Sequence, residues 1–482
     1  MAAFSPLDFA VVVVYLLSVT AWGAWLGRNQ RSASDYFLGG RDLPWGAVLL
    51  SVVATETSTL TFLSIPGVAY LGNLGFLQLT LGYLVGRVVV AVVLLPAYYR
   101  GDLNTAYALL EKRFGIGTRR FTSGVFMITR LLADSVRLFA TAIPLALITG
   151  WPYPLSIAVI GVLTLVYTYF GGIRAVVWVD ALQMGLYLVG AASALWVLHF
   201  MVPGGWGAVL ENAAAADKLS LLDFSLDLSV PYTLWAGLFG GGFLAMASHG
   251  TDQLIVQRLL TCRDLRSSQK ALIGSGVLVL VQFAIFLVIG IGLWAFYEGR
   301  EFPVADEIFA TFIIEQLPVG ITGFLIAGVF AAAMSSLSSS INSLASAAVY
   351  DFWAPLSRAV GDEFRVLRAG RVFTLIWAFL LIAIAVAYVP MSEDATAVEV
   401  ALTIASLVYG GLLGAFFLGI VDRRANQRGV ILGMTVGIGI ATSIWILAAA
   451  SIGWPWLVPI GAFVTVLVGA ATSRLASRRG MG

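Results

Sequence analysis

Charge is the scarcest property of this sequence. Asp, Glu, Lys and Arg together make up 11% of the 482 residues, whereas about a quarter of a soluble globular chain is charged. The hydrophobic share reaches 60%, and no polar stretch is long enough to form a separate soluble domain. The composition therefore predicts that the lipid bilayer surrounds most of the chain.

Cysteine and histidine are nearly absent. A lone Cys262 excludes disulfides and metal-thiolate clusters, and two histidines leave no His-rich metal site. The nucleotide-binding G-x-x-x-x-G-K-[ST] loop and the hydrolase motifs H-E-x-x-H and G-x-S-x-G are also missing. These absences argue against an ATP-driven pump and an intramembrane enzyme. The net charge of +2 gives no reason to expect a nucleic-acid partner, and nothing implies an obligatory protein partner.

Long apolar runs dominate what is present. Each run is about 20 or more residues long, which is the length of a membrane-spanning helix. The first run ends in basic residues rather than at a small-residue cleavage site, so we expect it to be a retained helix. The sequence predicts an all-α polytopic membrane protein with about 13 transmembrane helices. The predicted spans cover residues 6–26, 43–70, 74–99, 121–149, 153–171, 175–202, 231–258, 269–297, 320–350, 368–390, 394–421, 427–450 and 453–473.

Basic residues test this layout, because cytoplasmic connections of membrane proteins are enriched in Lys and Arg. The predicted outer connections hold only Lys218 and Arg300. Three basic residues lie within predicted spans: Arg87, Arg130 and Arg137. All the other basic residues of the 28 lie at the side of the membrane opposite to the outer connections, among them Arg174 and Arg258. The bias predicts a multi-pass protein of the cell (inner) membrane with its N-terminus outside and its C-terminus in the cytoplasm.

Two predicted spans are interrupted by polar residues in a similar way. The second span contains ATETST at 54–59, and the seventh contains SHGTDQ at 248–253. Because the two interrupted spans are five positions apart in the order of helices, the chain divides into two halves of opposite orientation, as in transporters with inverted repeats. Broken helices at matching places offer free carbonyls to a cation and helix N-termini to an anion. The alternative is that these hydroxyls bond back to their own helices.

This symmetry predicts a division of the chain into five parts. They are an N-terminal extra helix and linker (1–42), a first repeat of five helices (43–202), an extracellular loop (203–230), a second repeat of five helices (231–421), and two trailing helices with a basic tail (422–482).

A stripe of hydroxyls marks the ninth span. At about 100° per residue, one arc of the helix carries Ser335, Ser338, Ser339, Asn342 and Ser346. Hydroxyl oxygens suit a hard cation such as sodium, although small residues also favour close helix packing.

An acidic residue lies at a similar depth in the sixth span. Asp180 needs a partner inside the membrane. Arg174 is one candidate and a bound cation is the other.

Further charged residues lie within or near the membrane. Glu56 and Arg87 are the pair that we expect to touch a solute, and His249 in the second break is a candidate ligand or gate. The others are able to pair with one another: Arg130, Asp134, Arg137 and Asp252.

Four segments resemble a known family. Residues 34–45 (SDYFLGGRDLPW) resemble the entry segment of the sodium:solute symporter family, and residues 167–183, 251–258 and 332–343 are similar to the corresponding helices of sodium/glucose cotransporters. The resemblance implies a LeuT-type five-plus-five inverted-repeat fold. It also implies a sodium-coupled symporter that imports a small polar organic solute, such as a sugar, an organic acid or an amino-acid-like compound, by alternating access.

The same resemblance implies two ion sites. The principal sodium site uses the carbonyls of Ala54, Thr57 and Ala332 with the hydroxyls of Ser335 and Ser336. A second site, present in some members, uses Asp180 with Ser335, Ser338 and Ser339. Since every position carries a suitable group, we expect two sodium ions per cycle.

The sugar contacts of the glucose cotransporters are only partly retained. The lysine and glutamine expected on two later helices are replaced by Val279 and Leu402, which argues against glucose-type recognition. The predicted solute-binding residues are Glu56, Thr80, Tyr83, Arg87, Ser248, His249 and Asp252. Two alternatives stay open: a membrane sensor built on a transporter fold, and a transporter coupled to protons through Asp180.

Overall fold

The computed structural model describes the chain except for residues 1–3, 29, 31, 102, 303–304, 390–396 and 479–482. Its regular structure is helical, and an isolated β-bridge joins Leu43 to Cys262. The all-α prediction is confirmed. The helices are α1 (Pro6–Leu26), α2 (Ala33–Leu38), η1 (Gly39–Arg41), α3 (Trp45–Glu56), α4 (Thr59–Leu71), α5 (Phe76–Val89), η2 (Val90–Leu94), α6 (Leu95–Arg100), α7 (Ala108–Phe114), α8 (Ile116–Thr149), α9 (Tyr153–Met201), α10 (Gly205–Ala215), η3 (Ala236–Gly241), α11 (Gly242–Gly250), α12 (Gln253–Leu259), α13 (Leu265–Phe296), α14 (Ala305–Glu315), α15 (Ile321–Ala347), η4 (Ala348–Trp353), α16 (Ala354–Leu356), α17 (Glu363–Tyr388), α18 (Ala397–Val421), α19 (Gln427–Ala448), η6 (Trp454–Trp456) and α20 (Leu457–Arg478).

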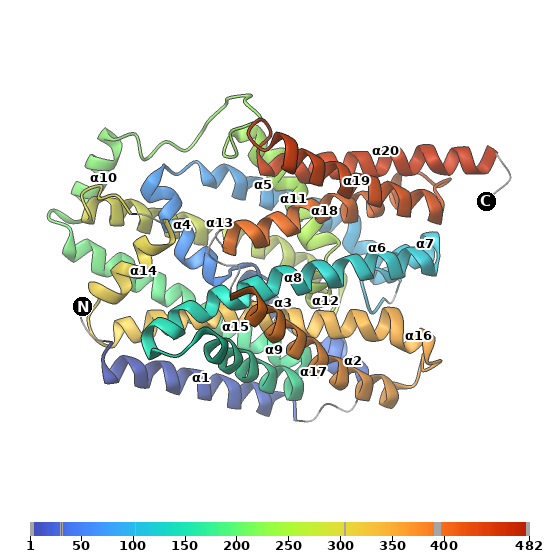
Figure 1. Cartoon of the computed structure of the whole chain (residues 1–482), viewed down its shortest axis with the longest axis horizontal. Coiled ribbons are helices and arrows are strands. Elements are labelled where there is room, and N and C mark those ends of the chain that lie inside the picture. Colours follow the sequence, from blue (N-terminus) through green and yellow to red (C-terminus); the bar gives the residue numbers. More distant parts are fainter. Residues whose placement is uncertain are drawn as a thin grey trace.

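The helices lie side by side along the long axis of the molecule (Figure 1). Among the described residues, nine helices are long and apolar enough to cross a membrane, or ten if the bent pair α3 and α4 forms one span. The predicted count of about 13 is not confirmed by this criterion. The predicted spans 368–390 and 394–421 each include residues outside the described part.

Both predicted interruptions are breaks in helices. The first lies between α3 and α4, whose axes differ by 63°, and Ser58 caps the start of α4. The second lies between α11 and α12, where Asp252 is extended (φ −84°, ψ 124°) and caps α12. Ser, Thr and Asp are favoured at such caps because their side chains accept from free backbone N–H groups.

A third irregularity separates two predicted spans within α9. Gly172 has φ 52° and ψ −159°, so two helical segments meet there. This backbone conformation is accessible to glycine and strongly disfavoured for other residues. The boundary predicted between the spans 153–171 and 175–202 is confirmed by this kink.

Helix α15 lies between α8 and α1 (Figure 1). It packs against α9, α8, α1 and α3, and every residue from Leu325 to Ala347 is buried. A helix that is buried on all sides belongs to the core. The serine stripe therefore faces neighbouring helices, among them the broken span of α3 and α4.

Candidate ion and solute site

The first broken helix and α15 border a small cavity. Helix α3 ends at Glu56, and Thr57 is extended with φ −79° and ψ 98°. The last carbonyls of a helix have no partner within it, so the break presents free oxygen atoms. The cavity has a volume of about 10 Å³, which is about one water-sized particle. Its lining residues are Ala54, Thr57, Gln183, Met184, Tyr187 and Ala332. Three residues predicted for the principal sodium site thus border one cavity.

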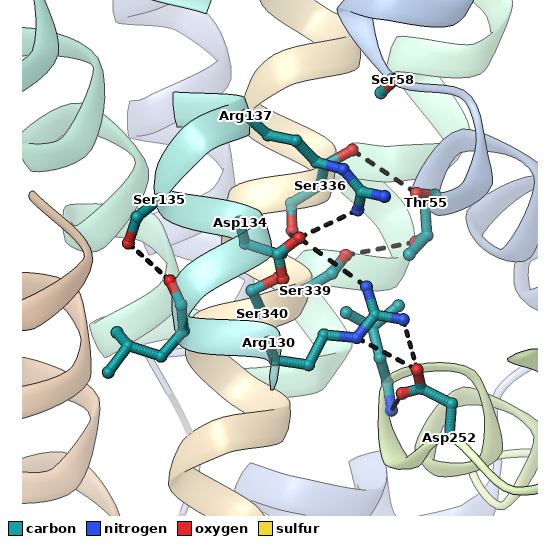
Figure 2. Close-up of polar contacts among 12 residues, drawn as sticks. Thr55, Ser58, Arg130, Asp134, Ser135, Arg137, Asp252, Ser336, Ser339 and Ser340 are labelled. Atoms are coloured by element: carbon teal, nitrogen blue, oxygen red, sulfur yellow. Dashed lines mark hydrogen bonds and ion pairs between the residues drawn. The ribbon is translucent and has the colours of Figure 1, made fainter. Parts of the chain in front are cut away.

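The other two predicted ligands, Ser335 and Ser336, are buried on α15. The Ser336 hydroxyl donates to the Ala332 carbonyl at 3.2 Å and lies 3.4 Å from the Thr55 carbonyl across the gap (Figure 2). Ser335 Oγ is buried beside the Asp180 carboxylate and makes no close hydrogen bond. Buried polar atoms are normally paired, so this oxygen fits a role as a cation ligand.

The predicted second site is built around Asp180 on α9, which is fully buried. Its Oδ2 accepts from Ser51 Oγ at 2.6 Å and from Arg258 Nη2 at 3.2 Å, while Oδ1 has no partner. Arg258 also donates to Ser339. Arg258 thus links Asp180 to Ser339 of the serine stripe.

The partner of Asp180 differs from the one considered in the sequence. Arg174 lies 3.5 Å from Asp42 and is half-exposed. Arg258, which the sequence placed in a cytoplasmic connection, is fully buried on α12. That placement was wrong because α12, the second half of a broken helix, carries Arg258 back toward the core. The need of Asp180 for a partner was the signal in the sequence that pointed to a missing cation.

Four of the predicted solute-binding residues form one cluster. Arg87 donates through Nη2 to Glu56, and the same nitrogen lies 3.0 Å from His249 Nε2. Arginine only donates, so His249 Nε2 accepts and His249 Nδ1 donates to Ser248 Oγ at 2.8 Å. A close approach of two helices makes the cluster possible, because a Cβ on Gly86 would lie 2.3 Å from the Gly242 carbonyl. Arg87 Nε and Nη1 are buried without partners.

The remaining predicted solute residues are arranged differently. The Thr80 hydroxyl donates to the Leu77 carbonyl of its own helix at 2.8 Å, and Tyr83 is partly buried on the same helix. Asp252 belongs to a separate network on the other side of the break. The structure therefore groups Glu56, Arg87 and His249, and it separates Asp252 from them.

A second small cavity lies between the first break, α8 and α15, also with a volume of about 10 Å³, about one water-sized particle. It is lined by Ser58, Asp134, Arg137, Leu138, Thr141, Ala333, Ser336 and Leu337. Arg137 is 22% exposed, whereas Arg87 and Arg258 are fully buried. Figure 2 shows the Arg137 guanidinium reaching from α8 toward the break. The sequence left its role open.

Three charged residues of α8, Arg130, Asp134 and Arg137, form a continuous network with Asp252 (Figure 2). Asp134 Oδ1 lies 2.9 Å from Arg137 Nη1 and 3.7 Å from Arg130 Nη1, and Asp134 also accepts from Ser340. Arg130 donates to Asp252, which the Tyr409 hydroxyl also contacts at 2.9 Å. These residues therefore pair with one another, which the sequence had left open.

A helical membrane bundle with two broken helices and cation-competent cavities beside one break defines a secondary transporter. The model of the sodium:solute symporter family matches residues 36–437. This chain belongs to the sodium:solute symporter family.

Relatives with known names span nearly the whole chain. The sodium/sialic acid symporter NanT of Aliivibrio fischeri is 32% identical over 98% of this chain and 94% of its own length. The human sodium/iodide cotransporter is 30% identical over 93% of this chain and 71% of its own. A solved structure of a Na+-coupled sialic acid symporter, in a substrate-bound outward-open state, has a TM-score of 0.86 at 27% identity and covers 98% of both chains.

These comparisons decide several predictions. The structure of the transporter Mhp1, with a TM-score of 0.53 at 13% identity, shares the fold, and the LeuT-type fold is confirmed. The chain is a multi-pass membrane transporter rather than an enzyme. It couples the symport of a small polar organic solute to sodium.

Proposed function

We propose that sodium binds in the cavity between the first break and α15, held by the carbonyls of Ala54, Thr57 and Ala332 and by the hydroxyls of Ser335 and Ser336. The observation that carries this proposal combines two features. Ala54, Thr57 and Ala332 line one cavity, and Ser335, which follows Ala332 on α15, has an Oγ that makes no close hydrogen bond. Neutral oxygen atoms are the ligands that a hard cation prefers.

A second sodium ion is proposed at Asp180, with Ser335, Ser338 and Ser339. The free Oδ1 of Asp180 supports it, and the Arg258 guanidinium already balances the carboxylate charge through Oδ2. An ion entering here therefore adds to a neutral pair and requires Arg258 to withdraw or share the carboxylate. With both proposed sites filled, two sodium ions would move in each cycle.

The solute is proposed to carry a carboxylate that Arg137 anchors. Arg137 is the cation among the residues lining the cavity beside Ser58, and guanidinium groups bind carboxylates in a two-pronged geometry. The relatives named above include symporters of sialic acid, which is a carboxylate. The cavity has room for about one water-sized group, so the body of the solute requires the helices to separate.

Glu56, Arg87, Ser248 and His249, with Tyr83 beside them on α5, are proposed as the polar wall on the other side of the break. Arg87 contacts Glu56 through one nitrogen, and its Nε and Nη1 donors are unpartnered. A polar group of the solute can accept from these donors when Glu56 moves aside. Thr80 and Asp252 have partners within the protein, and we assign them no contact with the solute.

The ion gradient supplies the driving force. Each sodium ion moving down a potential of about 100 mV contributes about 2.3 kcal/mol, and a tenfold concentration gradient adds about 1.4 kcal/mol. Sodium bridging the break and α15 favours the state that is open to the outside. Solute binding then lets the repeats, proposed at 43–202 and 231–421, rock to the inward-facing state.

The orientation is proposed to be N-terminus outside and C-terminus in the cytoplasm. Helices α6, α7 and α16 and the end of α20 lie at one end of the bundle, and the start of α1, α10 and α14 lie at the other (Figure 1). The first group carries the basic clusters, including Arg100, Arg113 and Arg474. Cytoplasmic ends of membrane proteins are basic.

Uptake by proteoliposomes tests the proposal. The probes are N-acetylneuraminate, lactate and iodide, with glucose as the uncharged comparison, each under an inward gradient of sodium or of potassium. We expect sodium-driven uptake of a carboxylate probe. Arg137→Gln is expected to raise the concentration of the carboxylate probe that gives half-maximal uptake about tenfold or more, since a charge-assisted contact contributes about 1.5–3 kcal/mol.

Arg119→Gln is the matched control, because Arg119 is a partly buried arginine of the same helix that pairs with Asp351 at 2.7 Å, away from both cavities. Equal carboxylate uptake by Arg137→Gln and the native protein would rule out the anchor. Equal uptake under sodium and potassium gradients would rule out the ion sites.

A further inference from the structure

Four charged side chains of alternating sign connect the cavity beside Ser58, the proposed solute cavity, to the second broken helix. In order they are Arg137, Asp134, Arg130 and Asp252, and the successive ion pairs include a contact of 2.9 Å at the first step and 3.7 Å at the second. At the third step Asp252 Oδ2 accepts from Arg130 Nε at 3.1 Å and also from Arg130 Nη2. Figure 2 shows that Arg137, Asp134 and Arg130 project from the same side of α8.

Asp252 holds three helices together. Its Oδ1 accepts from the Leu254 backbone N–H at 2.9 Å and so caps α12. Its Oδ2 is held by Arg130 of α8 and by the Tyr409 hydroxyl of α18. One carboxylate thereby fixes the start of α12 to two helices outside its own broken span.

Helix α12 in turn holds several neighbouring segments together. Its Arg258 reaches Asp180 on α9 and Ser51 on α3 at 2.9 Å. Just beyond it, the Leu43 backbone N–H donates to the Thr261 carbonyl at 3.1 Å. Cys262 at this junction is fully buried. A displacement of α12 would break these contacts together and expose the thiol.

Asp134 is shared unequally between two arginines. It contacts Arg137 at 2.9 Å and Arg130 at 3.7 Å. The two arginines and two aspartates balance in charge, so a change in one pair must be compensated by another in this low-dielectric setting. If Arg137 turns to another anion, Asp134 is left to attract Arg130. Asp134 then competes with Asp252 for the Arg130 guanidinium.

We infer that Asp134 and Arg130 are positioning residues that couple occupancy of the solute cavity to release of α12. A solute carboxylate on Arg137 releases Asp134, which draws Arg130 away from Asp252 and loosens the second half of the second broken helix. The identity of the triggering anion rests on the proposed function. The mechanical link from Arg137 to α12 does not.

Cys262 is the only cysteine of the chain, so its alkylation rate reports on α12 without any engineered label. The experiment measures the rate at which N-ethylmaleimide modifies Cys262 in purified, sodium-saturated protein without solute. Arg130→Gln and Asp252→Asn remove the clamp directly. Arg137→Ala mimics the capture of Arg137 by a solute, and Arg137→Ala/Asp134→Asn removes the carboxylate that would pull on Arg130.

We expect Arg130→Gln, Asp252→Asn and Arg137→Ala each to accelerate alkylation by about 5- to 150-fold, the range of ordinary coupling free energies. The double variant is expected to return to near the native rate. A residue that merely supports the fold would not give this reversal, because a second substitution would add damage. Arg119→Gln on the same helix, which breaks the ion pair of a partly buried arginine with Asp351, is expected to keep the native rate.

Two results would overturn the inference. One is a native alkylation rate in Arg130→Gln that elutes as folded, monodisperse protein. The other is a double variant that is alkylated as fast as Arg137→Ala. Because no solute is present, neither result depends on whether Arg137 anchors a carboxylate. That question is decided separately by the uptake of carboxylate probes.

Discussion

At the scale of single residues, the membrane interior of this protein is organised by ion pairs that are complete within the protein. Glu56, Asp180 and Asp252 each have an arginine partner on another helix. Such pairs cost desolvation energy and are stable only when both members stay matched. Oxygen atoms that make no close hydrogen bond in this setting are therefore the informative ones, and Ser335 Oγ and Asp180 Oδ1 are two of them.

Removing the Ser335 hydroxyl is expected to weaken sodium binding. Ser335→Ala takes away an oxygen without breaking a close hydrogen bond that the hydroxyl makes in the protein. A contact to a charged partner contributes about 1.5–3 kcal/mol, so the sodium concentration for half-maximal uptake should rise about tenfold or more. Ser343→Ala is the matched control, because Ser343 Oγ bonds to the Ser340 carbonyl of its own helix at 3.2 Å. Equal sodium dependence in both variants would contradict the assignment.

Neutralising Asp180 is expected to destabilise the protein through Arg258. Asp180→Asn leaves a fully buried guanidinium without its counter-charge, which costs about 3–5 kcal/mol. Asp180→Asn/Arg258→Met removes both charges and should recover much of the loss. The measurement is thermal unfolding in detergent for both variants. A double variant less stable than Asp180→Asn would show that Arg258 is not held chiefly by this carboxylate.

At the scale of elements, close helix packing decides which side chains reach the site. Predicting both breaks needed only the polar runs at 54–59 and 248–253, because the interior of a membrane helix is otherwise apolar. The contact of Arg87 with His249 could not be predicted in that way. It depends on α5 and α11 approaching at Gly86, and neither helix alone encodes their relative rotation.

The trailing helices give a test of packing alone. A Cβ on Gly433 of α19 would lie 2.5 Å from the Thr465 carbonyl of α20, whereas one on Gly439 would meet nothing within 4 Å. Gly433→Ala is therefore expected to lower stability by about 1–3 kcal/mol through overpacking. Gly439→Ala, on the same helix, should not. Thermal unfolding of the two variants measures this difference in stability, and equal melting temperatures would contradict the close contact between α19 and α20.

At the scale of the whole molecule, the distribution of charge gives the proposed orientation. The loop after α10 and the basic connection after α18 belong to opposite ends of the bundle, and Ser225 and Arg424 are exposed on them. In cells carrying Cys262→Ser, we expect a membrane-impermeant maleimide to label Ser225→Cys from outside and Arg424→Cys only after permeabilisation. The reverse pattern would invert the proposed topology.

The sequence by itself determined the membrane class, the two breaks, the serine stripe and the family resemblance. These features are local: apolar length, polar interruptions and helical periodicity can be counted along the chain. It also placed the ligands of both proposed ion sites on helices that the structure brings together.

Only the tertiary structure decided which charges pair. Arg258 lies 78 residues from its partner Asp180 in the sequence. The network of ion pairs from Arg137 to Asp252 joins α8 to α12. A buried charge requires a partner, but its choice among several arginines depends on helix rotation and on the turn of the chain at each break. Those are set by the packing of the helices against one another, because a side chain inside the membrane can pair only with what the neighbouring helices present to it.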